Sequence, residues 1–253
     1  MVERLRIVHV ASEAVPVAKT GGLADVAGAL PAAQAAAGHE VAVVVPCYRR
    51  GAGPPDRFEP TGRRIPAGEI HFDVLRRDIG GVCSLLLDAP RLFERPGLYG
   101  ARDGDYPDNP IRFAAFARGA VRAAMAELGR VDLFHCHDWQ AALVPQLLGT
   151  DPLLRGEGAG TPAVLTIHNL AYQGSFEPWV LDAARLPREL FTPLGFELYG
   201  RVNFLKGGIL AADALTTVSP TYAREILTVE HGCGLHEVLG ARRHLLEGIL
   251  NGL

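Results

Sequence analysis

The sequence has no excess of positive charge and no long apolar run. Its 253 residues carry a formal net charge of −3, and its isoelectric point is near 6.3. Nucleic-acid-binding domains usually carry a strongly basic patch, so we expect no nucleic-acid partner. The longest apolar stretches, such as residues 41–45, are far shorter than the roughly 20 residues of a membrane-spanning helix. We therefore expect no membrane association.

Cysteines are few and widely separated. Cys47, Cys83, Cys136 and Cys233 form no Cys-x-x-Cys pair. The sequence enters an apolar strand candidate directly, without the pattern of a signal peptide. Disulfides are typical of small secreted domains, so in a domain of this size we expect reduced thiols. These features favour a cytoplasmic protein.

Three common cofactor and catalytic motifs are also missing. The first glycines stand at positions 21, 22 and 28, which is not the Gly-x-Gly-x-x-Gly spacing of dinucleotide-binding folds. Neither the Gly-x-x-x-x-Gly-Lys-Ser/Thr loop nor the Gly-x-Ser-x-Gly elbow occurs. These absences argue against a nicotinamide oxidoreductase, a P-loop NTPase and an ordinary α/β-hydrolase.

The sequence does contain short apolar runs that alternate with helical segments. Buried parallel strands read as continuous apolar runs, and their alternation with helices implies crossover connections. Hydrophobic residues make up 48% of the chain, enough for the core of one large domain. We therefore predict one α/β domain over residues 1–253, with a doubly wound, mostly parallel, Rossmann-like sheet. The expected strands are 5–10, 41–46, 82–87, 131–135, 163–167 and 214–218, and the expected helices are 22–37, 111–128, 140–148, 203–212 and 222–227.

Two regions depart from this alternation, and the end of the chain has a pattern of its own. Residues 49–80 are rich in proline, glycine and arginine, and they predict a surface loop with an edge hairpin. Residues 176–200 have weak periodicity and three prolines, and they predict short helices over the site. Residues 246–253 are typical of a strand that reaches a turn. Ser219 and Pro220 have the pattern of a helix start, with serine as the N-cap.

The first polar cluster follows the first strand candidate. The run Lys-Thr-Gly-Gly-Leu at positions 19–23 leads into an alanine-rich helix. Backbone amides at a helix N-terminus, beside Gly21 and Gly22, suit an anionic group such as a diphosphate. Lys19 adds a positive charge at the same edge. The run also fits a tight turn between a strand and a helix, and the pattern leaves both interpretations open.

A second polar cluster, His-Cys-His-Asp-Trp at 135–139, follows another strand candidate. Imidazole and carboxylate groups are ordinary zinc or iron ligands. No further element with metal-ligand spacing supports them, so we predict no metal here. Asp138 either caps the following helix or directs its carboxylate toward a sugar hydroxyl, and a single cap could do both.

The third cluster, residues 168–174, follows the strand candidate at 163–167. His168 and Asn169 precede a Tyr-Gln-Gly run, which offers several hydrogen-bond donors and acceptors at close range. Ligands of doubly wound sheets bind at the carboxyl ends of the strands, where all three clusters are expected. Such a set suits a polyhydroxylated substrate.

These clusters resemble the N-terminal motifs of the ADP-glucose-dependent glycogen and starch synthases. The resemblance extends over essentially the whole chain and keeps the family's order. It implies the GT-B fold, in which two Rossmann-like domains face each other across a cleft, and it assigns this chain to the N-terminal domain. The matching runs are 19–25, 92–99, 105–109, 135–139, 166–174, 203–208, 217–225 and 248–252.

The resemblance implies retaining transfer of glucose from ADP-glucose to the non-reducing end of an α-1,4-glucan. No metal or other cofactor is implied, and the expected partners are ADP-glucose, the glucan and a C-terminal GT-B domain. The implied site residues are Asp138 and His168 as catalytic groups, and Lys19, Gly21, Gly22, Asn169 and Tyr99 as substrate-binding groups.

The second GT-B domain has no counterpart in the sequence. The family places most nucleotide contacts in that domain, so we expect the chain alone to be inactive. Two alternatives stay open at this point. The chain could be a non-catalytic module that binds glucan or nucleotide, or the partner of a separate C-terminal half. It could also belong to a sucrose-phosphate or UDP-dependent synthase, although the run at 19–23 favours the ADP-glucose branch.

Overall fold

A nine-stranded sheet forms the centre of the described residues. The computed structural model describes residues 4–49, 57–154, 158 and 160–252. All neighbouring strands are parallel except at one edge, where two antiparallel strands close the sheet. This confirms the predicted mostly parallel α/β fold. The strand order is β14 (Leu246–Gly248), β13 (Ala214–Thr217), β9 (Ala163–Ile167), β8 (Leu133–His137), β1 (Arg6–Val10), β2 (Glu40–Pro46), β5 (Val82–Asp88), β4 (Ile70–Ile79) and β3 (Glu59–Ala67).

The predicted strands are present, with one shift that matters for function. Every residue of β2 after its first is buried, as expected of a strand covered on both faces. The strand predicted at 131–135 instead runs from Leu133 to His137. His135 and His137 therefore lie within β8, on one face of the sheet, because side chains alternate along a strand. The predicted terminal strand is confirmed as β14.

Helix boundaries follow local sequence signals. The first helix ends just before Gly38, whose φ of +101° is costly for residues other than glycine. The third ends at Gly129 (φ +73°). Ser219 caps its helix as predicted, because its hydroxyl oxygen accepts the Tyr222 N–H. The helices are α1 (Gly22–Ala36), α2 (Pro90–Phe93), α3 (Asn109–Leu128), α4 (Asp138–Ala141), α5 (Leu143–Thr150), α6 (Val180–Ala183), α7 (Phe204–Ala211), α8 (Pro220–Glu225) and α9 (His236–Ala241).

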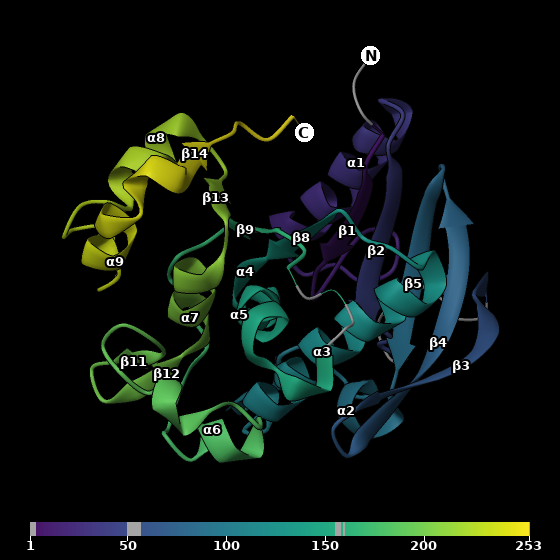
Figure 1. Cartoon of the computed structure of the whole chain (residues 1–253), viewed down its shortest axis with the longest axis horizontal. Helices are drawn as coiled ribbons and strands as arrows, with labels where there is room; N and C mark the ends of the chain where they lie inside the picture. Colours follow the sequence, from purple (N-terminus) through teal and green to yellow (C-terminus); the bar gives the residue numbers. More distant parts are fainter. Residues whose placement is uncertain (1–3, 50–56, 155–157, 159, 253) are drawn as a thin grey trace.

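The two ends of the sheet have different coverings. Figure 1 shows α8, α9 and β14 together at one end, beside β13, and the β3–β4 hairpin at the opposite end. This hairpin confirms the prediction of an edge hairpin. Residues 50–56 of the predicted loop lie outside the described residues.

The region at 176–200 differs in part from its prediction. It contains the short helix α6, but it also contributes to a small antiparallel sheet that the sequence did not predict. This sheet has the order β10 (Ser175–Phe176), β12 (Arg201–Asn203) and β11 (Glu197–Leu198), and a separate pair joins β6 (Gly100–Ala101) to β7 (Gly104–Asp105).

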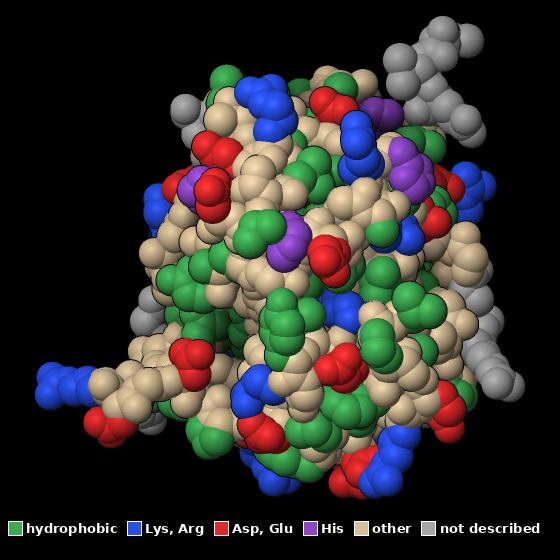
Figure 2. Space-filling model, turned by 90° about the vertical axis from the view of Figure 1, so that its left-hand side faces the viewer, with side chains coloured by type: hydrophobic (Ala, Val, Ile, Leu, Met, Phe, Trp, Pro, Cys, Tyr) green, Lys and Arg blue, Asp and Glu red, His purple; other side chains and the backbone are tan. Residues whose placement is uncertain are grey.

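The outer surface carries both signs of charge. Lys and Arg side chains intermix with Asp and Glu side chains on the face shown in Figure 2. Such a mixture differs from the basic stripe that is typical of nucleic-acid-binding surfaces. Among the described helices, none combines the length and apolar character needed to cross a bilayer.

Candidate active site

The three polar clusters meet where neighbouring parallel strands end. Strands β9, β8 and β1 are adjacent in the sheet, and in this register His9 of β1 lies beside His135 of β8. The loop after β1 carries the Lys19 cluster, β8 leads directly into Asp138, and β9 leads into His168. The topology thus brings together segments that are up to about 150 positions apart in the sequence.

Glu13 organises the loop after β1. Its buried carboxylate accepts the backbone N–H and the hydroxyl of Thr20, with hydroxyl distances of 2.8 and 3.0 Å, and the Gly21 N–H at 3.4 Å. The Tyr99 hydroxyl donates to the same carboxylate at 2.7 Å. Two of the backbone amides next to the helix N-terminus are therefore held by an internal carboxylate. Tyr99, predicted as a donor contact, lies where it can orient Glu13.

Lys19, Gly21 and Gly22 are exposed, whereas Leu23 is buried in the core. Lys19 is half exposed, and its ammonium group donates to Asp25 at 2.6 Å. Gly21 is the extended N-cap of α1. A Cβ atom placed on Gly21 or Gly22 would meet nothing within 4 Å, so the backbone is open to close approach by a ligand. The prediction that these residues bind the donor stays a prediction.

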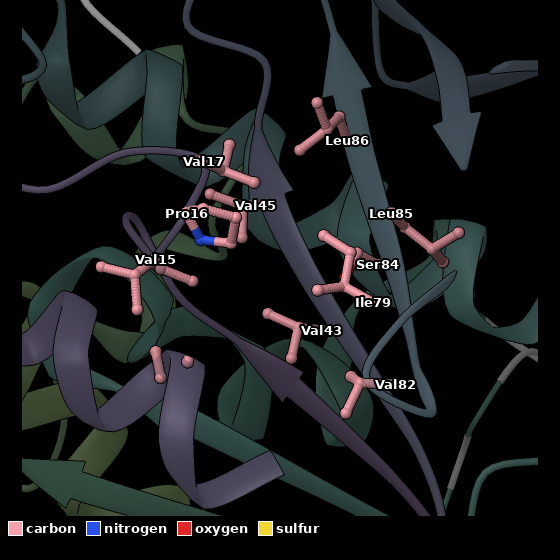
Figure 3. Close-up of a pocket in the computed structure, with 13 residues that line it drawn as sticks. Val15, Pro16, Val17, Val43, Val45, Ile79, Val82, Ser84, Leu85 and Leu86 are labelled. Carbon is pink, nitrogen blue, oxygen red and sulfur yellow. The ribbon is translucent and has the colours of Figure 1, made fainter. Parts of the chain in front are cut away.

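A small apolar cavity lies where the same loop packs against the sheet. Figure 3 shows Val15, Pro16 and Val17 lying over Val43 and Val45 of β2, with β5 beside them. The cavity has a volume of only about 40 Å³, roughly the space of one water molecule. It is therefore too small to be a substrate site. The apolar side chains around it hold the loop against the sheet. Gly28 of α1 permits this packing, because a Cβ there would lie 2.4 Å from the Val15 side chain.

Asp138 and His168 lie in direct contact. Asp138 Oδ1 accepts the His168 backbone N–H at 2.7 Å. Of the two interpretations left open for Asp138, the helix cap is wrong, because this carboxylate bonds across to the next strand end and makes no capping bond to α4. Asp138 adopts φ +55°, a left-handed conformation that aspartate tolerates better than most residues.

Burial changes the charge state of both groups. It raises the pKa of Asp138 to about 7, although the backbone N–H groups of His168 and Asn169 counteract this shift, and the charge of Glu13 reinforces it. Burial lowers the pKa of His168 to about 4. At neutral pH His168 is therefore an uncharged imidazole, and Asp138 is divided between its two forms. Such displaced values are common at functional sites.

The loop after β9 holds its own polar residues in place. Asn169 is exposed, and its Oδ1 accepts the Ala171 N–H at 3.0 Å. Gln173 donates to the Leu170 carbonyl and accepts from Asn203 at 2.6 Å. Internal hydrogen bonds therefore hold this loop, and the prediction that Asn169 binds substrate stays a prediction.

Three further histidine rings lie together beside His168, and His137 is the one that contacts it. His9, His135 and His137 are buried, and one ligand atom from each lies within 4.8 Å of the others. Burial lowers the pKa of His9 to about 4, and it lowers those of His135 and His137 well below the ordinary value. A metal ion would have to displace the hydrogen bonds that both ring nitrogens of His9 and His137 already make. The predicted absence of a metal stays a prediction.

Two of these features were not predicted from the sequence. His9 belongs to the first strand candidate, but its partners become known only when β1 and β8 are paired. The hydrogen bonds that converge on the Glu13 carboxylate include one from Tyr99, which is 86 positions further along the chain. The His-x-His spacing at 135 and 137 was an available signal, because alternate residues of a strand share one face.

The parallel sheet and its polar strand ends define one Rossmann-like half of a GT-B glycosyltransferase. Residues 6–241 match the family described as starch synthase catalytic domain. The chain belongs to this family.

Relatives in curated collections and among solved structures agree. The chain is 46% identical to glycogen synthase 2 of Geobacter metallireducens over 98% of its own length and 52% of the relative. It is 47% identical to the glycogen synthase of Myxococcus xanthus, over 98% of this chain and 53% of the relative. The catalytic domain of starch synthase IV from Arabidopsis thaliana, bound to ADP and acarbose, has a TM-score of 0.88 and 32% identity over 99% of this chain and 52% of that chain. The chain thus spans about half the length of these relatives.

Proposed function

We propose that this chain forms the N-terminal half of a glycogen synthase. The reaction would be retaining transfer of glucose from ADP-glucose to the non-reducing end of an α-1,4-glucan. The observation that carries the proposal is the direct contact of Asp138 with His168 at adjoining strand ends. It occurs in a chain that is 46% identical to a glycogen synthase.

The chemistry of the site suits this reaction. Departure of ADP leaves positive charge on the sugar ring and negative charge on the diphosphate. The ionised form of Asp138 and the neutral ring of His168 favour the developing positive charge. Gly21, Gly22 and Lys19, at the start of α1, favour the diphosphate. We assign no side chain as a covalent nucleophile, so a front-face substitution accounts best for retention.

Donor and partner assignments rest on the relatives. The binding of ADP by the Arabidopsis enzyme supports ADP-glucose as the donor. The half-length match supports a second GT-B domain as the partner that completes the site. We further propose that transfer needs no metal or cofactor. A cytoplasmic location is supported by the four cysteines, all of which are free.

Radiolabelled glucose transfer to glycogen tests the proposal. ADP-glucose and UDP-glucose are compared as donors, with and without a recombinant C-terminal half from the Geobacter metallireducens relative. We expect transfer from ADP-glucose only when the second half is present, and no effect of EDTA. Glucan or nucleotide binding without transfer in any arm would contradict the proposal and favour a non-catalytic binding module.

A further inference from the structure

A hydrogen-bonded chain of histidines connects the surface of α1 with the site. The Oε1 atom of Gln34 lies 2.7 Å from His9 Nε2. His9 Nδ1 lies 3.0 Å from His137 Nε2, and His137 Nδ1 lies 3.0 Å from His168 Nε2. Both ring nitrogens of His9 and His137 are therefore used. Gln34 is partly exposed and borders a groove of about 310 Å³ between α1 and residues 249–252.

The chain of rings permits two arrangements of protons. A neutral imidazole has one N–H donor and one acceptor nitrogen. Burial lowers the pKa of each ring in the chain, so all of them are neutral at pH 7. In each pair, Nδ1 of one ring faces Nε2 of the next ring. A ring that donates through Nε2 has an unprotonated Nδ1, which must accept, so the next ring must also donate through its Nε2. The three rings are therefore all Nε2–H tautomers or all Nδ1–H tautomers.

The orientation of the Gln34 amide decides between these arrangements, because its oxygen can only accept from His9 Nε2 whereas its NH₂ group could only donate to it. Its amide oxygen accepts from His9 Nε2. His137 then donates from Nε2 to His9, and His168 donates from Nε2 to His137. We infer that Gln34, acting through His9 and His137, holds His168 as the Nε2–H tautomer.

The consequence for His168 is an acceptor nitrogen at Nδ1, to which no described residue donates a hydrogen bond. In that tautomer the ring accepts a hydrogen bond from a sugar hydroxyl and cannot donate one through Nδ1. Gln34, His9 and His137 are thus positioning residues for the sugar-binding group. This inference rests on the proposed function for its role in transfer, but the tautomer itself is a property of the free protein.

Histidine-selective ¹⁵N NMR of the 253-residue chain tests the inference directly, because it shows which ring nitrogen carries the proton. We expect Nε2–H signals for His9, His137 and His168. Gln34→Glu keeps an acceptor and keeps these signals. Gln34→Lys can only donate, so it reverses the three rings to Nδ1–H, while Gln34→Leu gives a mixture. Gln146→Leu, on α5, is the matched control and leaves the histidine signals unchanged.

A second readout separates this hydrogen-bonded relay, Gln34–His9–His137–His168, from the proposed function. With the recombinant second half present, Gln34→Lys should lower kcat about tenfold or more, the effect of one mispaired hydrogen bond, and Gln34→Glu should retain activity. An Nδ1–H tautomer of His168 in the wild type, or no change in Gln34→Lys, overturns the relay even if transfer occurs. The expected tautomers with no transfer in any variant overturn the proposed function and leave the relay intact.

Discussion

Replacement of Glu13 should destabilise the loop that carries Lys19 and the glycines. Glu13 is 3% exposed and accepts hydrogen bonds from Thr20 and from the Tyr99 hydroxyl. A hydrogen bond to a charged group contributes about 1.5–3 kcal/mol, and buried donors left unpaired add a desolvation cost. Some of these donors will find water in the variant. We therefore expect Glu13→Ala to lower the free energy of unfolding by about 3–4 kcal/mol.

Glu13→Gln should be much milder because two of the donors are hydroxyl groups. The new amide NH₂ can occupy the position of Oε1, where the hydroxyls of Tyr99 and Thr20 rotate to accept from it. Its carbonyl oxygen still accepts the Thr20 N–H. We expect a loss of about 1 kcal/mol, similar to that of Tyr99→Phe, which removes one hydroxyl.

Urea denaturation followed by circular dichroism measures these differences. For a protein of this size, 3–4 kcal/mol corresponds to a fall in Tm of roughly 6–16 °C. The expected order of destabilisation is Glu13→Ala first, with Glu13→Gln and Tyr99→Phe close together and smaller. Ordinary surface substitutions change the free energy of unfolding by up to about 0.5 kcal/mol. A change that small for Glu13→Ala would refute the conclusion that Glu13 holds the loop in place.

Three further substitutions test other parts of the structure. Gly174→Ala should lower the free energy of unfolding by more than about 2 kcal/mol, because Gly174 has φ +61° and the new Cβ would lie 2.5 Å from the Trp139 ring. Unchanged stability and unchanged Trp fluorescence would contradict this. Arg118→Ala should lower the free energy of unfolding by about 3 kcal/mol, because it removes the buried guanidinium group that bonds the Asp151 carboxylate and the Ala184 and Arg185 carbonyls. Urea denaturation compared with Arg130→Ala, an exposed control, measures this loss. The pKa of His9 is lowered to about 4, so its contribution to stability is complete above pH 6.5 and is lost as the pH falls toward 4, by about 3 kcal/mol. His9→Phe should therefore show a weaker fall in unfolding free energy between pH 7 and pH 4.5 than the wild type, and parallel profiles would disprove the assignment.

The architecture was largely predictable because each buried strand is a continuous apolar run. The boundaries of β1, β2 and β9 lie within one residue of their predictions. Where the prediction failed, tertiary contacts rather than local sequence determine the secondary structure. Strands of two or three residues, such as β10 and β11, carry no periodic signal of their own. The helix predicted at 140–148 is divided at Ala142 into α4 and α5.

The site was predictable in its position but not in its connections. Polar residues at strand ends could be recognised without knowing the sheet order, so Asp138 and His168 could be expected at one edge of the sheet, while their roles in catalysis stay a prediction. Their hydrogen bond could not be foreseen, since it requires β8 beside β9. The bond between His9 and His137 likewise depends on the pairing of β1 with β8. Strand order is a property of the whole fold rather than of any local pattern.

The measurement closest to the central claim is the initial rate of glucose transfer from ADP-glucose to glycogen by the complemented protein. Wild type, Asp138→Asn and His168→Ala are compared, with Gln146→Leu, on α5, as a control. We predict activity in the wild type and the control, and a loss of about 10²–10³-fold in each site variant, because a group that stabilises transition-state charge is removed. Wild-type rates in Asp138→Asn and His168→Ala, with folding intact, would contradict it.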